Sequence, residues 1–206
     1  MIKFIKKYLI GLMACAVLYI AYQHYQYMPH CAYDNVQVCF TPERKCTPFI
    51  LQTIYKAKKN IKIQAYSFTS SDIANVLVVM KNRGVDVQVI LDKSNLNQNE
   101  AIKKLKQHNI PVLIDYVPGI AHNKIIIIDD EYVLTGSFNF SQAADSRNVE
   151  NVAVIKSNEV AKLYLNNWLQ RERFSKHIDD DELTTNIYKP WKNEYRRKPV
   201  KKSIAV

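Results

Sequence analysis

The sequence HNKIIIIDDEYVLTGSFN, residues 122–139, contains the pattern from which the architecture follows. It holds two β-rich runs, Lys124–Ile128 and Tyr132–Leu134, on either side of a polar turn at 129–131. Two such runs around a polar turn are typical of strands joined by a turn. We therefore expect two connected strands here, with polar side chains at the ends of the pair.

The segments on either side alternate between strand and helix patterns. The predicted strands before the stretch are 36–41, 61–68, 85–91 and 111–114, and the predicted helices between them are 47–60, 71–84 and 97–109. Thr47 is expected to cap the first of these helices, with Pro48 at its first position. A short helix from Ser141, a strand at 149–155 and a helix at 158–174 follow the stretch. This order predicts an α/β (α+β layered) fold, a mixed β-sheet flanked by helices.

The alternation of side chains along a strand predicts which polar residues share a site. His122 and Lys124 project from one face, whereas Asp129 points to the other. A lysine supplies positive charge for an anion, and histidine is suited to proton transfer or nucleophilic attack near neutral pH. The four isoleucines that follow Lys124 predict a rigid strand with dry flanks.

A second group of polar residues follows the stretch's second strand. Gly136 permits close backbone approach, and Ser137 and Asn139 offer neutral donors that suit a phosphoryl group. Glu150 lies near the start of a later strand, where it can accept a hydrogen bond from the far ring nitrogen of His122. We expect these residues to form one site.

The combined spacing H-x-K-x4-D-x6-G-S-x-N is present over residues 122–139 without a mismatch. It resembles the signature of the phospholipase D superfamily. The similarity covers roughly 36–175 and is closest to single-motif members: bacterial secreted endonucleases, short bacterial phospholipase D proteins and the Zucchini-type nuclease of mitochondria. It implies a phospholipase D-like fold with one motif per chain.

The resemblance implies phosphodiester hydrolysis without metal or cofactor. One histidine attacks phosphorus to form a phosphohistidine, and a second histidine protonates the leaving oxygen. The chain has one such histidine, His122, since no other histidine is followed two residues later by lysine. The resemblance therefore implies a homodimer in which both His122 residues meet, each with Lys124 and Asn139 at the phosphate.

The resemblance also assigns roles to the other motif residues. It implies that Glu150 is the partner of His122 and that Asp129 is a structural residue outside the phosphate pocket. Ser137 would support the phosphate or a neighbouring loop, and Gly136 completes the motif.

The charge of the chain is concentrated at its two ends. The formal net charge is +10, of which residues 1–7 carry +3 and residues 189–202 carry +6. Residues 8–188 hold 19 basic and 18 acidic side chains and are nearly neutral. The net charge alone therefore does not tell whether the partner is a nucleic acid or an anionic membrane. The basic C-terminal segment can equally be a solvated tail.

The N-terminal residues have the pattern of an export segment. Three lysines precede the uncharged run Tyr8–Tyr22, and Lys and Arg then stay absent until Arg44. This predicts a signal anchor or a cleaved signal peptide that places the rest outside the cytoplasm, membrane-anchored or secreted; a buried first helix is the alternative. We expect residues 1–30 to be this segment and its linker, 31–177 the catalytic domain and 178–206 a basic tail.

Three cysteines follow the apolar run. Cys31, Cys39 and Cys46 can form a disulfide, stay free or bind zinc with His30, although their spacing matches no standard zinc pattern. The long cysteine-rich insertion of Zucchini-type nucleases is absent.

Two enzymatic functions and one non-enzymatic function fit the sequence. The first is an endonuclease on DNA or RNA. The alternative is a phospholipase D that releases headgroups from phosphatidylcholine-type lipids, leaving phosphatidic acid at a membrane, where Trp191 and Tyr195 could touch the headgroups. A membrane-tethered binding protein is the third.

Overall fold

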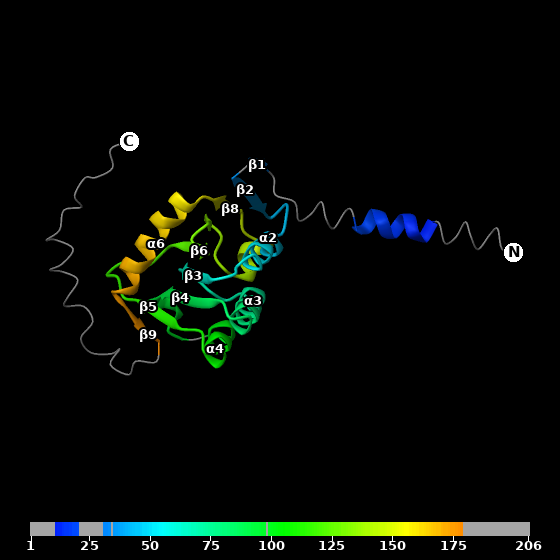
Figure 1. Cartoon of the computed structure of the whole chain (residues 1–206). Helices are drawn as coiled ribbons and strands as arrows, with labels where there is room; N and C mark the ends of the chain where they lie inside the picture. Colours follow the sequence, from blue (N-terminus) through cyan, green and yellow to red (C-terminus); the bar gives the residue numbers. More distant parts are fainter. Residues whose placement is uncertain (1–10, 21–30, 34, 98, 179–206) are drawn as a thin grey trace.

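The structure is a computed structural model, and it describes residues 11–20, 31–33, 35–97 and 99–178. Within these residues nine strands form one mixed sheet in the order β1-β2-β8-β7-β6-β3-β4-β5-β9 (Figure 1). The strands are β1 (Cys31–Tyr33), β2 (Val36–Thr41), β3 (Asn60–Ala65), β4 (Asp86–Asp92), β5 (Val112–Asp115), β6 (Lys124–Ile128), β7 (Tyr132–Gly136), β8 (Glu150–Lys156) and β9 (Ser175–His177).

Five labelled α-helices and one 3-10 turn connect these strands. They are α2 (Thr47–Ile54), α3 (Ser71–Asn82), η1 (Lys93–Asn95), α4 (Glu100–Gln107), α5 (Gln142–Ser146) and α6 (Asn158–Glu172). Side-chain caps define several starts. Ser70 accepts a hydrogen bond from the amide of Ile73 at the start of α3, and Asn99 accepts from two amides at the start of α4.

Parallel and antiparallel halves meet at β3. Strands β3, β4 and β5 are parallel and are joined by the crossover helices α3 and α4. Strand β6 pairs antiparallel with β3, and β7, β8 and β2 continue the antiparallel half. The predicted fold class, a mixed sheet flanked by helices, is confirmed.

The sheet is buried on both faces. Helices α2, α3 and α4 cover one face, and α6 covers the other (Figure 1). The isoleucine run of β6 alternates between the two cores, with Ile126 and Ile128 on the first side and Ile125 and Ile127 beside Trp168 of α6. The indole of Trp168 donates a hydrogen bond to the Ile63 carbonyl at 3.0 Å, which fixes α6 to β3. The dry flanks predicted for this strand are confirmed.

Several predicted element ends are wrong by a few residues. Helix α2 ends at Ile54 instead of in the basic stretch that follows. The amides of Lys56 and Ala57 bind the carbonyls three residues before them in a tighter turn, and the amides of residues 58–60 bind Asp129. Cys46, not Thr47, is the residue that precedes this helix. The helix predicted at 97–109 begins at Glu100, because Asn99 caps it. Strands β1 and β9 were not predicted, since three residues carry too little periodicity.

The cysteine alternatives are resolved in part. Cys39 and Cys46 form a disulfide, and Cys15 is a free, exposed thiol. The side chain of Cys31 lies outside the described residues.

The predictions for the two ends of the chain mostly fall outside the described residues. Residues 11–20 form a helix whose side chains are all exposed. In the part of the chain that the structure describes, no helix has both the length and the apolarity to cross a membrane. The remainder of the predicted anchor, and all of the basic tail beyond residue 178, are not described.

Asp129 has the structural position that was expected for it. It lies in the turn after β6, with φ 54°, at the opposite end of that strand from Lys124. Its carboxylate accepts hydrogen bonds from the amides of Lys58, Lys59 and Asn60 at 2.7, 2.7 and 2.9 Å. Asp129 therefore ties the segment between α2 and β3 to the β6–β7 turn.

The substitution Asp129→Asn should destabilise the fold without touching the site. Three charge-assisted hydrogen bonds are weakened, so we expect a loss of roughly 1.5–3 kcal/mol in the free energy of unfolding, measured by urea denaturation. Asparagine tolerates a positive φ, so the backbone adds little to this loss.

Asp130→Asn is the matched control, because Asp130 shares the turn and the positive φ but its exposed side chain has no hydrogen-bond partner among the described residues. Its stability should stay within about 0.5 kcal/mol of wild type. Equal losses in the two variants would contradict the assigned role of Asp129.

Candidate active site

The antiparallel order of three strands gathers the motif residues at one edge of the sheet. Lys124 begins β6, Gly136 ends β7 and Glu150 begins β8. Because β6, β7 and β8 are consecutive antiparallel neighbours, these three strand ends lie side by side. Ala65, the last residue of β3, is paired with Lys124 at the same edge.

His122 and Lys124 both contact one aromatic ring. The ring of His122 packs against the ring of Tyr66 with an interplanar angle of 59° and 4.6 Å between the centroids. His122 is an exposed residue. The Lys124 ammonium lies 5.0 Å from the centroid of Tyr66 and donates a hydrogen bond to the His122 carbonyl at 2.9 Å. The structure thus brings the predicted nucleophile and the predicted cation together.

Lys124 is unusually enclosed for a lysine. Its residue exposure is 7%, and its side chain lines a cavity of about 10 Å³ together with Ile50 and Phe138. Burial lowers the pKa of Lys124, and the negative charge of Glu150 opposes this by a smaller amount. The ammonium therefore belongs to a site that is partly desolvated before any substrate binds.

Gly136 is required by a close backbone approach. A Cβ atom at this position would lie 2.2 Å from the carbonyl oxygen of Asn151 on β8, and φ is 151°. Real Cβ atoms do not come this close to a backbone atom, so any other residue would push β7 away from β8. This close approach gives a physical reason for glycine at this place in the motif.

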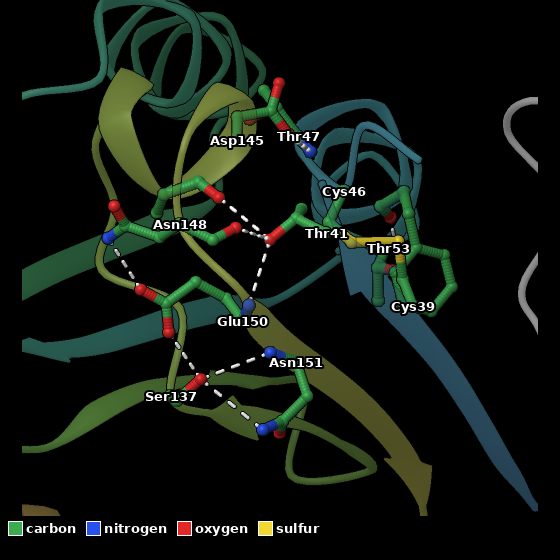
Figure 2. Close-up of a disulfide and its surroundings, with 12 residues drawn as sticks. Cys39, Thr41, Cys46, Thr47, Thr53, Ser137, Asp145, Asn148, Glu150 and Asn151 are labelled. Atoms are coloured by element: carbon green, nitrogen blue, oxygen red, sulfur yellow. Dashed lines mark hydrogen bonds between the residues drawn. A yellow bond between two sulfur atoms is a disulfide. The ribbon is translucent and has the colours of Figure 1, made fainter. Parts of the chain in front are cut away.

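Glu150 is fixed by neighbours on both of its carboxylate oxygens. Ser137 Oγ donates to Oε2 at 2.5 Å, and Asn148 Nδ2 donates to Oε1 at 2.9 Å (Figure 2). Ser137 Oγ in turn accepts from the amide of Asn151 at 3.1 Å. No hydrogen bond joins Glu150 to His122, both of which the structure describes, so the expected His122–Glu150 pair is not formed within this single chain.

Asn139 is held by its backbone and not by its side chain. The Asn139 carbonyl accepts from the Ser141 amide at 2.7 Å. Its side-chain Oδ1 is enclosed and has no hydrogen-bond partner among the described residues. The side-chain amide is therefore not engaged by the protein's own network and can serve a ligand.

Two contributors to this edge were not singled out from the sequence. Tyr66 contacts both His122 and Lys124, and Asn148 orients Glu150. The available signal for Tyr66 was an aromatic residue near the end of the strand predicted at 61–68. For Asn148 there was no signal, because it lies in a loop outside any periodic pattern.

The assembled edge contains an imidazole, an ammonium group and a side-chain amide, which are groups that suit phosphodiester chemistry. Comparison with known proteins agrees: residues 50–171 match the family described as "Cardiolipin synthase, PLD-like domain". The chain belongs to the phospholipase D superfamily.

Relatives in this superfamily carry several names. Phospholipase D of Rickettsia typhi is 48% identical over 151 residues, which covers 73% of this chain and 74% of that protein. The mitochondrial cardiolipin hydrolase of Chlamydomonas reinhardtii is 31% identical over 127 residues, 61% of this chain and 54% of that protein. Nuc from Salmonella typhimurium, a phospholipase D family member of known structure, is 37% identical, with a TM-score of 0.65 over 69% of this chain and 96% of that one.

A metal centre is not part of the described edge. Among the residues that the structure describes, no three His, Cys, Asp or Glu side chains gather closely enough to hold an ion.

The ammonium of Lys124 should titrate below the range of ordinary lysines. Burial disfavours the charged form of Lys124 and lowers its pKa. The ¹³Cε chemical shift of Lys124, assigned by its loss in the Lys124→Arg variant, should follow this titration. In Glu150→Gln the pKa should fall further, since the opposing negative charge is gone.

Lys156 provides the comparison within the same spectra. Its pKa is raised, chiefly by a hydrogen bond with Glu131, so it should titrate above the ordinary range. Titration of Lys124 together with the surface lysines would contradict the burial argument.

Proposed function

We propose that this phosphodiester hydrolase works in two steps through His122. A ring nitrogen of His122 attacks phosphorus, the P–O bond to the leaving group breaks, and a second histidine gives its proton to the departing oxygen. That histidine then removes a proton from water, which attacks the phosphohistidine and breaks the P–N bond. The observation that carries this proposal is the partly buried ammonium of Lys124, which donates a hydrogen bond to the His122 backbone and is placed to neutralise a phosphate.

We propose that the second histidine comes from a second copy of the chain. Of the other described histidines, His108 directly follows helix α4 and His177 lies on β9, the outermost strand of the sheet. Neither belongs to the group of strand ends that carries the motif residues. A two-fold axis beside this edge would bring two His122 rings to one phosphate, with Lys124 and Asn139 from each copy. Glu150 would then have a histidine partner in the assembled site.

We infer a phospholipid as the first candidate substrate. Relatives from two Rickettsia species, 48 and 49% identical, are named phospholipase D. Two large apolar side chains next to motif residues are exposed: Ile120 at 58%, two residues before His122, and Val149 at 85%, directly before Glu150. Apolar groups around a phosphate site suit a lipid better than a polyanion.

The second candidate is a nucleic acid, as in the endonuclease predicted from the sequence. The similarity to Nuc supports it, since that structure is matched over nearly its full length. The near-neutral body of the chain argues against an extended polyanion groove.

We further propose that the domain works outside the cytoplasm, tethered or exported through residues 1–22. The Cys39–Cys46 disulfide supports this, because such bonds persist in oxidising compartments.

The full chain, purified in mild detergent with excess chelator, should hydrolyse phosphatidylcholine vesicles faster than plasmid DNA or RNA. In His122→Asn the rate should fall by at least about a thousandfold, because the nucleophile is lost. Headgroup release and nucleic-acid cleavage are measured side by side. Cleavage of DNA alone would favour nucleic acid over phospholipid as the substrate. Activity that survives in His122→Asn would refute the mechanism, as would activity that the chelator abolishes.

Subunit mixing tests the shared site. When wild type is dissociated and reassembled with a roughly fivefold excess of His122→Asn, activity per wild-type chain should fall about sixfold, since few wild-type chains then find a wild-type partner. An equal excess of Asp130→Asn, which keeps His122, should leave the activity per His122-bearing chain unchanged. Constant activity in the first mixture would show that each chain acts alone.

A further inference from the structure

A buried hydroxyl connects the disulfide loop to Glu150. Thr41, the last residue of β2, is paired directly opposite Glu150 in the antiparallel ladder and is fully buried. We propose that Thr41 is a positioning residue that sets the place of the Glu150 carboxylate. This inference rests on the proposed role of Glu150 as the partner of a catalytic histidine.

The hydroxyl of Thr41 fixes two backbone segments at once. Its Oγ1 accepts a hydrogen bond from the amide of Glu150 at 3.1 Å. Its single proton is directed to the carbonyls of Ala144 at 3.0 Å and Asn148 at 2.9 Å. The start of β8 and the end of α5 are therefore held at a common point, as Figure 2 shows.

The segment held by Thr41 also carries one of the two side chains that orient the carboxylate. Asn148, whose carbonyl is held by Thr41, donates from its side chain to Glu150 Oε1 at 2.9 Å. Ser137 donates to the other oxygen from the neighbouring strand. Because the backbones of Asn148 and Glu150 share one hydroxyl, a shift of either one disturbs the hydrogen bond between their side chains.

The position of Thr41 is itself restrained from two sides. The disulfide between Cys39 and Cys46 closes the loop that contains Thr41 and links β2 to the start of α2. The next residue, Thr47, donates its amide to Asp145 of α5 at 2.8 Å. Thr41 and Thr47, at the two ends of this loop, therefore both bind α5: Thr41 through the Ala144 carbonyl and Thr47 through the Asp145 carboxylate.

A displaced Glu150 has a specific chemical consequence. A carboxylate that accepts a hydrogen bond from a histidine holds the orientation and tautomer of that ring. If Thr41 positions Glu150, loss of its hydroxyl weakens this interaction, and the ring is held less well for attack on phosphorus. The step that makes or breaks the P–N bond slows, while phosphate binding by Lys124 is preserved.

The test compares Thr41→Val with wild type in the full chain. We expect kcat to fall roughly tenfold to a hundredfold with KM within about twofold, because misplacement by about an ångström affects the reaction more than binding. The pH profile of kcat should change in the same way as in Glu150→Gln. Thr41→Ser keeps the hydroxyl and should restore both kcat and the profile.

Thr53→Val is the matched control. Thr53 is also buried and its hydroxyl donates to the Phe49 carbonyl at 2.9 Å, but this bond stays inside α2 and does not reach Glu150. It should lose comparable stability without a change in the pH profile. If Thr41→Val and Thr53→Val behave alike, or if Thr41→Ser fails to restore the profile, the inference is wrong.

A measurement independent of activity separates this inference from the proposed function. The Glu150 amide should exchange its hydrogen faster in Thr41→Val but not in Thr53→Val, after correction for global stability. If exchange is faster in Thr41→Val but Glu150→Gln keeps full activity, the hydrogen bond between Thr41 and Glu150 is supported and the proposed catalytic role of Glu150 is refuted. Unchanged exchange, together with a strong loss of activity in Glu150→Gln, would refute only the role of Thr41.

Discussion

The register of the antiparallel strands is the constraint on which the site depends. The site residues are far apart in sequence, and they meet because β6 begins, β7 ends and β8 begins at one edge of the sheet. A slip of one residue would turn every side chain of a strand to the other face and separate Lys124 from its neighbours. Gly136 makes this register sterically possible, since only a residue without Cβ allows Asn151 so close. At the other end of β6, Asp129 fixes the turn through three backbone amides.

Much of this arrangement was predictable because it depends on local periodicity and on short-range spacing. The isoleucine run after Lys124 alternates between two cores as a doubly covered strand requires. The whole motif lies within 18 consecutive residues, from His122 to Asn139, and the strand order gives it geometry. Fold class and family followed from these patterns, whereas the start of α4 was misplaced because a single side chain, that of Asn99, caps it.

What could not be predicted depends on contacts between distant segments. Nothing in the sequence around Tyr66 indicates that its ring contacts both His122 and Lys124, because this requires the β3–β6 pairing. Glu150 was expected to accept from His122, whereas in the single chain its two oxygens accept from Ser137 and Asn148. These bonds join side chains across strands and a loop, where neither period nor propensity gives information. A short loop between two cysteines likewise does not reveal which backbone amide its threonine will bind.

The enclosure of Lys124 explains how a nearly neutral domain can recognise a phosphate. Surface charge attracts polyanions over long distances, but salt screens it. Lys124 acts differently: its desolvation is part of the folded state, and its pKa is already lowered before a substrate arrives. Among described residues its ammonium donates only to the His122 carbonyl and otherwise faces the Tyr66 ring, so a phosphate oxygen offers the charged partner that the fold does not supply. Contacts with a prearranged charge need no reorganisation during the reaction and are strong where water is excluded. In the mechanism that we propose, one enclosed lysine beside each histidine acts directly at the reacting phosphorus, which long-range attraction between charges does not do.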